Sequence, residues 1–141
     1  MERIEFCSLL KEVRQSEESG YTQAEIANAL GVSTTTISKL ENGKYNFSMN
    51  FVFRYIKALC TYIYLISNDD CKLVICDSDI ADFMITYRDC KYGLELQDIA
   101  DLVGCSALTI DRIEKCEESM TIDSFLKFID SIGYRIEVFQ T

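Results

Sequence analysis

The sequence matches itself when it is shifted by 73 positions, and this internal repeat is the strongest limit on its fold. Turn glycines, helix-capping residues and apolar residues coincide between the two copies. The identical pairs are Gly20 and Gly93, Ile26-Ala27 and Ile99-Ala100, Gly31 and Gly104, Ser33 and Ser106, Thr36-Ile37 and Thr109-Ile110, Glu41 and Glu114, Ile56 and Ile129, and Ile63 and Ile136. Chance similarity between two helical segments is the alternative, but the matching of turns and caps favours a duplicated unit.

Each copy is predicted to contain several helices followed by a strand. In the first copy, apolar residues at helical spacing predict four helices, and their expected ranges are 6–13, 22–30, 34–41 and 48–59. Thr22 and Glu25 have the spacing of a capping box, and Gly31 supplies the left-handed conformation of a tight turn. The second copy repeats this plan.

The hydrophobic period then changes from that of helices to that of strands. Three strands are expected, at residues 62–66, 72–76 and 134–139. We therefore expect three parts in the chain. They are residues 1–67 (the first copy with its strand), 68–78 (a strand and linker) and 79–141 (the second copy with its strand).

Two short helices joined by a glycine turn form a helix-turn-helix, whose second helix fits the DNA major groove. The segment from Thr22 to Lys44 reads TQAEIANALGVSTTTISKLENGK. It resembles the phage-repressor (Cro/XRE) helix-turn-helix family of bacterial and phage transcription regulators. The resemblance implies a mainly α fold of two tandem lambda-repressor-like units, the second degenerate, with short strands forming a small antiparallel sheet. The strands depart from the five-helix family plan and are similar to those that help antitoxin-like members to dimerise.

The resemblance also implies which residues contact DNA. Gln23 would bind a phosphate, and Asn42 and Lys44 would lie near the DNA backbone. The groove-facing residues would be Thr34, Thr35, Ser38 and Lys39. Hydroxyl groups pair with either base type and Lys reaches guanine acceptors, so the chemistry agrees. A solvated, cap-rich helix start is the alternative for the threonines, and Thr36 is expected to turn inward.

Both copies place an arginine late in the first helix and a glutamate at the end of the third. The pairs are Arg14 with Glu41 and Arg88 with Glu114. A phosphate contact by Arg14 is the alternative. Because the pattern occurs twice, we favour structural ion pairs that fix the third helix.

Charge divides the two copies. The chain carries a formal charge of -9. Residues 1–68 hold seven basic and seven acidic side chains, whereas residues 69–141 hold seven basic and sixteen acidic ones. The second copy has Leu96, Ala107, Leu108 and Asp111 in place of Gln23, Thr34, Thr35 and Ser38. Its carboxylates at Asp98, Asp101 and Asp111 would repel phosphates. We expect this copy to face away from DNA and to serve assembly or partner binding.

Several functions are not expected of this sequence. It has no His, which excludes Ser-His and Cys-His catalytic pairs. Its seven cysteines include no Cys-x-x-Cys pair, and no phosphate-binding glycine loop is present. We therefore expect no catalytic residues, no metal and no cofactor. The acidic start and the short apolar run at 58–66 predict no signal peptide, no membrane span and a cytoplasmic location.

Sequence-specific transcription regulation, with the helix Thr34–Glu41 in the major groove of double-stranded DNA, is the leading hypothesis. One reading unit covers roughly three to five base pairs, so we expect a homodimer on two half-sites about one helical turn apart. Whether the strands at 62–66 and 135–139 pair within a chain or between chains is left open. The alternative is a protein-interaction module, antitoxin-like or anti-repressor-like, whose acidic second copy binds a basic protein partner.

Overall fold

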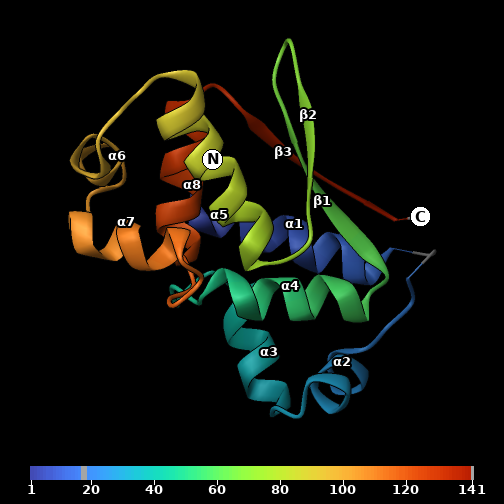
Figure 1. Ribbon diagram of the computed structural model, residues 1–141. Coiled ribbons are helices and arrows are strands. Elements are labelled where there is room, and N and C mark those ends of the chain that lie inside the picture. Colours follow the sequence, from blue (N-terminus) through green and yellow to red (C-terminus); the bar gives the residue numbers. More distant parts are fainter. Residues whose placement is uncertain (17–18, 141) are drawn as a thin grey trace.

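The computed structural model describes residues 1–16 and 19–140, which form a body of helices with a small sheet along one side of it (Figure 1). The first part contains α1 (Arg3–Gln15), α2 (Gln23–Leu30), α3 (Thr34–Glu41), α4 (Met49–Ala58), β1 (Thr61–Ile66) and β2 (Cys71–Val74). The second part contains α5 (Asp77–Ile85), the π-helix η1 (Thr86–Lys91), α6 (Leu96–Val103), α7 (Ala107–Glu114), α8 (Ile122–Ser131) and β3 (Arg135–Gln140). The predicted mainly α class with a small antiparallel sheet is confirmed. Below, residues 1–67 and 79–141 are called the first and second unit.

Local capping chemistry explains where the helices of the first unit begin. The Thr22 hydroxyl accepts a hydrogen bond from the Glu25 amide at 3.1 Å, and the Glu25 carboxylate accepts one from the Thr22 amide at 3.1 Å. Ser33 caps α3 in a similar way, through the amide of Thr36 at 3.2 Å. These side chains satisfy amides that have no partner inside their helices, so the polypeptide enters a helix at each of them.

Positive φ angles occur in equivalent places in the two units. Within the described residues they form four pairs, each separated by 73 positions: Gly20 and Gly93, Gly31 and Gly104, Gly43 and Cys116, and Cys60 and Gly133. Cys116 (φ 58°) and Cys60 (φ 56°) are the two that are not glycine. Both units therefore turn the backbone in the same way at the same points, even where the residue type differs.

The two units meet through paired contacts. An isolated antiparallel bridge joins Ser48 and Thr121, which lie 73 residues apart. Beside it the Met49 amide donates to the Met120 carbonyl at 2.7 Å, and the Ile122 amide donates to the Phe47 carbonyl at 2.9 Å. Side chains add two more bonds across the same boundary, from the Asn50 amide to Ser119 Oγ and from the Asp123 amide to Asn46 Oδ1, both at 3.0 Å.

The sheet joins the units a second time. Its strand order is β2-β1-β3, and both pairings are antiparallel. β1 and β3 pair within one chain, which decides the question that the sequence left open, and Tyr64 stands opposite Glu137. β2 ends at Val74, earlier than predicted, because Cys76 is already the N-cap of α5.

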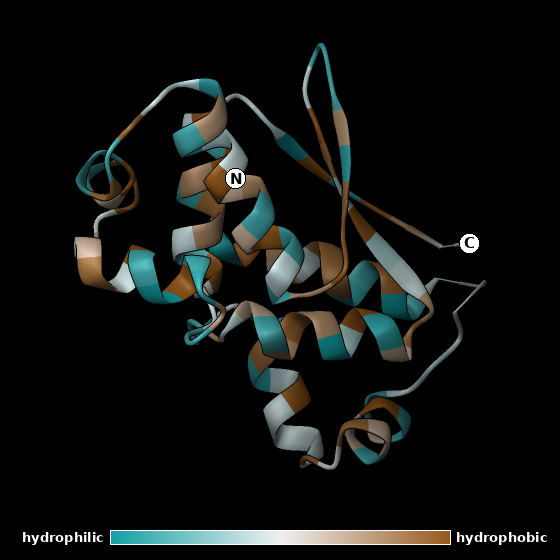
Figure 2. Cartoon of the chain, in the orientation of Figure 1, coloured by the Kyte–Doolittle hydropathy of each residue, from teal (hydrophilic) through white to brown (hydrophobic). Residues whose placement is uncertain are grey.

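One hydrophobic core runs through both units. Phe6 and Tyr55 of the first unit and Phe125 and Phe128 of the second are almost fully buried in the same cluster. On β1, Ile63 and Leu65 point into this core. Figure 2 shows hydrophobic and hydrophilic residues alternating around the helices, so that each helix has an apolar side to bury. The two units therefore share a single hydrophobic core. Their origin by duplication stays a prediction.

Candidate nucleic-acid interface

The exposed side of α3 carries most of the residues that the sequence singled out. Ile37 and Leu40 are completely buried and anchor the helix on the core. The side chains on the opposite side are all exposed, namely Thr34, Thr35, Ser38 and Lys39. The structure therefore brings three hydroxyl groups and one ammonium group together on a single accessible surface, which we call the α3 face.

Glu41, the last residue of α3, is the centre of a buried hydrogen-bond network. Arg14 binds both of its carboxylate oxygens, through Nε at 2.6 Å and Nη2 at 2.8 Å. The Tyr55 hydroxyl donates to Oε2 at 2.6 Å, and Gln23 Nε2 donates to Oε1 at 2.9 Å. Glu41 therefore ties α1, α2 and α4 to the end of α3, which fixes the orientation of the α3 face.

The network keeps Glu41 ionised. Burial works to raise the pKa of this carboxyl group, but the hydrogen bonds from Arg14, Tyr55 and Gln23 outweigh it and hold the pKa below its ordinary value. The hydrogen bond to Glu41 raises the pKa of Arg14. Burial, followed by the bond to Glu41, raises the pKa of Tyr55 far above its ordinary value. Each hydrogen of the network thus stays on its present donor near neutral pH.

Gln23 lies at the first position of α2, half-buried beside this network. Its amide nitrogen has two hydrogens, and Glu41 accepts one of them. The other hydrogen is not used by Glu41. The phosphate contact expected of Gln23 stays a prediction, and the bond to Glu41 shows how the amide is positioned before any ligand arrives.

The residues after α3 form a tight turn. Asn42 is the C-cap, and its side-chain oxygen accepts a hydrogen bond from the Lys44 amide at 2.9 Å. Both side chains are exposed, so they lie at the surface just beyond the α3 face. Thr36 is half-buried, and its hydroxyl lies 3.0 Å from Ser33 Oγ. That contact belongs to the start of the helix.

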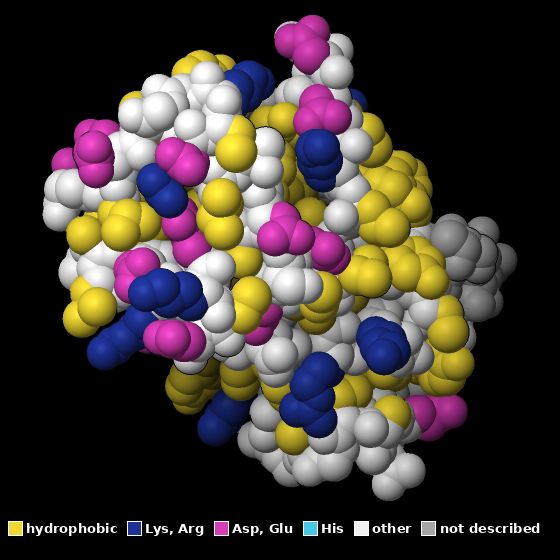
Figure 3. Space-filling model, viewed as in Figure 1, with side chains coloured by type: hydrophobic (Ala, Val, Ile, Leu, Met, Phe, Trp, Pro, Cys, Tyr) yellow, Lys and Arg dark blue, Asp and Glu magenta, His cyan; other side chains and the backbone are white. Residues whose placement is uncertain are grey.

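One residue beside the α3 face, Tyr45, was missed by sequence reasoning. Tyr45 is exposed, and Lys39 Nζ lies 5.0 Å from the centre of its ring, which is within cation–π range. Arg54 on α4 donates to the Leu30 carbonyl at 2.7 Å, at the end of α2. Figure 3 shows Lys and Arg side chains over α4, on the same part of the molecule as α2 and α3. The sequence separation of Lys39 and Tyr45 did not indicate this contact, because a turn lies between the two residues.

The second unit keeps the ion pair and loses its surroundings. Arg88 binds both oxygens of Glu114, through Nε and Nη2, each at 2.8 Å. The residue 73 positions after Tyr55 is Phe128, and the residue 73 after Gln23 is Leu96, so neither can donate to this carboxylate. The second unit therefore retains the contact that holds its third helix but not the polar groups around it.

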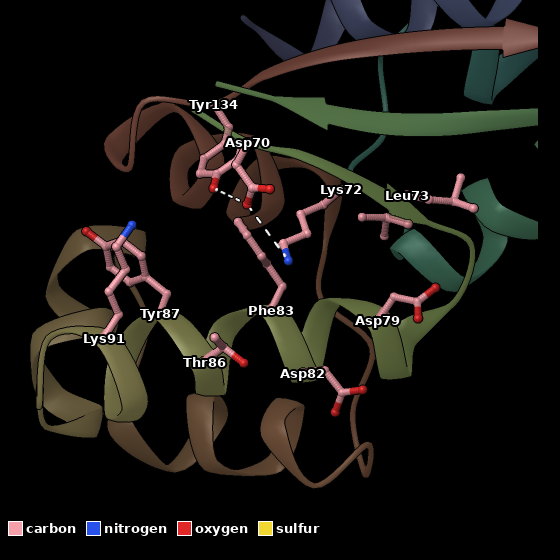
Figure 4. A pocket seen from close by; sticks show the side chains of 11 residues that line it. Asp70, Lys72, Leu73, Asp79, Asp82, Phe83, Thr86, Tyr87, Lys91 and Tyr134 are labelled. Atoms are coloured by element: carbon pink, nitrogen blue, oxygen red, sulfur yellow. Dashed lines mark hydrogen bonds and ion pairs between the residues drawn. The ribbon is translucent and has the colours of Figure 1, made fainter. Parts of the chain in front are cut away.

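A separate hollow lies between β2, α5 and Tyr134, with a volume of about 280 Å³ (Figure 4). Three of its polar side chains pair with one another. The Tyr134 hydroxyl donates to Asp70 Oδ2 at 3.0 Å, and Lys72 Nζ lies 3.8 Å from the same oxygen. The hollow is lined by the sheet and the second unit and takes no part in the α3 face.

The cysteines offer no metal site in the described part of the chain. All seven are free thiols, and no group of three metal-ligating side chains occurs among the described residues. Cys7 is completely buried, and burial raises the pKa of its thiol to about 11. This thiol is therefore protonated and packs as a small apolar side chain.

Two short helices, a glycine turn and an exposed polar face on the second helix define a helix-turn-helix unit. Residues 10–59 match the family model described as Helix-turn-helix, and this segment is a helix-turn-helix domain. The match covers α2, α3 and α4 and the C-terminal part of α1, residues 10–15. No curated protein and no solved structure matches the chain. Among the described helices, none is long and apolar enough to cross a membrane.

Proposed function

We propose that this protein is a sequence-specific DNA-binding transcription regulator that reads the major groove with α3. The observation that carries the proposal is the α3 face itself, because all four of its side chains are exposed and polar while the helix beneath them is fixed by Glu41. A rigid helix with accessible hydroxyl and ammonium groups suits base contacts, since such contacts need correct placement before binding.

The charged side chains of the first unit support the placement of α3 against DNA. The side chains that can meet phosphates from this part of the surface are Lys39, Lys44, Arg54 and Lys57. Gln23 and the exposed amides near the start of α2 add uncharged donors. With so few cations, the affinity depends on base contacts more than on phosphate neutralisation. The logarithm of the binding constant should fall with the logarithm of salt concentration with a slope no steeper than about -4.

Selection from a random duplex pool tests the proposal. The selected duplex is then titrated at about 50 and 200 mM salt with the wild-type chain and with the double variant Thr34→Ala, Lys39→Ala. We expect an enriched motif, a shallow salt slope and at least a hundredfold loss of affinity in the double variant. Both side chains are exposed, so the variant should unfold at the wild-type denaturant concentration.

A matched control changes the second unit at the equivalent positions. Arg112 lies 73 residues after Lys39, and the residue 73 after Thr34 is already Ala107. The single variant Arg112→Ala is therefore the equivalent change, and it should leave the affinity for the selected motif within a few fold of wild type. Normal operator affinity in the double variant would overturn the assignment of α3. Absence of any enriched motif at low salt would overturn the regulator itself.

The homodimer and the cytoplasmic location expected from the sequence stay predictions. β1 pairs on both edges inside the chain, so a second copy would have to bind through another surface. The possibility of an enzyme gains no support from the site, which is a binding surface of hydroxyl, amide and ammonium groups.

A second candidate function is binding of a basic protein through the second unit. Leu102 and Leu108 are 41% and 57% exposed, and Asp101 and Asp111 lie on the same two helices. Apolar side chains among carboxylates suit an amphipathic basic helix. Titration with a Lys- and Leu-rich helical peptide tests this function. We expect Leu108→Ala to weaken the binding, and equal affinity in that variant would contradict it.

A further inference from the structure

The contacts between the units repeat when the units are exchanged. Adding 73 to Met49 gives Ile122, and subtracting 73 from Met120 gives Phe47. The bond from Met49 to Met120 and the bond from Ile122 to Phe47 are therefore the same contact made in both directions. Such reciprocity is the mark of a two-fold interface, in which each side uses the same surface.

Two antiparallel pairs locate the axis of this symmetry. Ser48 pairs with Thr121, and Tyr64 stands opposite Glu137. In both pairs a residue meets its own equivalent, 73 positions further on, and this happens only on the axis that relates the two units. One pair lies between α4 and α8 and the other in the sheet, so the axis passes through both regions.

The two helix-turn-helix segments lie on either side of this axis. α3 ends at Glu41 and α7 ends at Glu114, each seven residues before the bridge between Ser48 and Thr121. Both helices therefore end near the axis and extend away from it, as Figure 1 shows for α3 and α7. α7 occupies the place that the α3 of a partner would take in a symmetric dimer.

We propose that one chain binds DNA as a dimer would, but reads only one half-site, so that its operator is a single non-palindromic sequence. This inference rests on the proposed function. The second unit lies over the neighbouring half of the site without reading it. This inference replaces two expectations from the sequence, that the second unit faces away from DNA and that a homodimer binds two half-sites.

The side chains of the second unit explain why it would not read bases. Eight positions correspond to the polar surface of the first unit, and the replacements are Gln23 by Leu96, Asn28 by Asp101, Thr34 by Ala107, Thr35 by Leu108, Ser38 by Asp111, Lys39 by Arg112, Asn42 by Lys115 and Lys44 by Glu117. The formal charge of these positions changes from +2 to -1. A surface that has lost its hydroxyl groups and gained carboxylates makes few contacts with bases or phosphates.

Asp98 does not contribute to this difference. Its carboxylate accepts a hydrogen bond from the Glu95 amide at 2.8 Å, which is the capping contact that Glu25 makes in the first unit. Both units are acidic at this position. The contrast between the units therefore lies in Asp101, Asp111 and Glu117.

The operator and the number of bound chains can be measured on the full chain. Selection from a random duplex pool gives the motif, and sedimentation of the complex with the selected duplex gives its stoichiometry. We expect a motif without internal symmetry and one chain per duplex. An inverted repeat bound by two chains would overturn the inference and leave the regulator intact.

A graft tests the placement of the second unit. The variant Ala107→Thr, Leu108→Thr, Asp111→Ser, Arg112→Lys copies the α3 face onto α7 and leaves the packed Leu96 unchanged. A second graft adds Leu96→Gln. We expect both grafts to select an inverted repeat of the wild-type half-site at one fixed spacing, still with one chain, and to bind it at least tenfold more tightly than a single half-site.

The control makes similar changes away from α7, with Leu73→Thr on β2 and Asp82→Ser on α5. It should select the wild-type motif. A graft that selects only the single half-site, although it unfolds as wild type does, would overturn the placement. If the wild-type chain selects no motif, the proposed function is overturned. This inference, which rests on it, is then overturned as well.

Discussion

Tyr55 donates its hydroxyl hydrogen to Glu41 at 2.6 Å, and the residue 73 positions after it is Phe128, which has no hydroxyl to donate. The first unit thus has a polar side chain bound to the buried glutamate at a position where the second unit has an apolar one. Because the acceptor is an ionised carboxylate that is 4% exposed, the loss of this bond is costly.

Tyr55→Phe should lower the free energy of unfolding by about 2 kcal/mol, the usual cost of removing a hydrogen bond to a buried charge. Chemical denaturation at neutral pH measures this. Tyr64→Phe is the control, because no hydrogen bond of this hydroxyl occurs in the described part of the structure, and it should change the stability by less than about 0.5 kcal/mol. Equal effects of the two substitutions would contradict the role given to the Glu41 network.

Stability should fall in acid because of Glu41. Its pKa lies below the ordinary value of 4.5, so the unfolded chain takes up this proton at a higher pH than the folded chain. The stabilisation is complete above the unfolded-state pKa and is lost as the pH falls through the lower folded-state pKa. Glu41→Gln should cost about 3 kcal/mol at neutral pH, because Arg14 is left buried, and should lose less stability than wild type on going to pH 3.5. The same acid loss in both proteins would argue against this assignment.

The two cysteines with positive φ should be sites for stabilisation. Cys60 and Cys116 are exposed and hold a left-handed backbone conformation that costs a residue with a Cβ atom about 1 kcal/mol. Cys60→Gly and Cys116→Gly should each raise the free energy of unfolding by about that amount, as measured by denaturation under reducing conditions. A loss of stability in both variants would show that the conformation is not strained.

Gly43 should tolerate a Cβ atom less well than Gly31. Both have φ 71°, but an added Cβ at Gly43 would lie 2.8 Å from Ile4 Cα, whereas at Gly31 it would meet nothing within 4 Å. Gly31→Ala should cost about 1 kcal/mol, and Gly43→Ala should cost roughly 1–3 kcal/mol more because the backbone of α1 must move. Thermal unfolding of both variants gives the comparison, and equal costs would mean that α1 shifts freely.

The carboxylates of the second unit should repel DNA. Asp101→Asn with Asp111→Asn should raise affinity for a random duplex severalfold at about 50 mM salt and much less at 200 mM, since repulsion is screened. The charge-matched control is Asp69→Asn with Asp82→Asn, on the hairpin and α5, and it should have a smaller effect. Equal gains in the two double variants would show that only net charge matters.

Features set by neighbouring residues could be predicted from the sequence. The Thr22–Glu25 capping box, the turn at Gly31 and the Ser33 cap depend on two to four adjacent residues, whose chemistry is sufficient to specify them. The helix-turn-helix segment was predicted for the same reason, since it follows from periodicity and turns. A small antiparallel sheet was also predicted, but the pairing of β1 with β3 inside one chain was left open, because it depends on packing between distant segments.

Features that depend on packing could not be predicted. Tyr55 and Gln23 lie 14 and 18 residues from Glu41 in sequence, and nothing in their spacing indicates that they meet there. The contact between Lys39 and Tyr45 depends on the path of the turn between them. The π-helix η1 and the positive φ of Cys60 are also absent from the sequence signals, because residue preference argues against both.

The reciprocal contacts at Ser48 and Thr121 belong to one chain, and this makes the association of the two units an intramolecular event. Such an association responds to the length of the connecting segment and not to the number of molecules in the cell. The units cannot be diluted apart, and the unfolding midpoint should be the same at any protein concentration. A cell that makes only a few copies of this protein would have every one of them fully assembled.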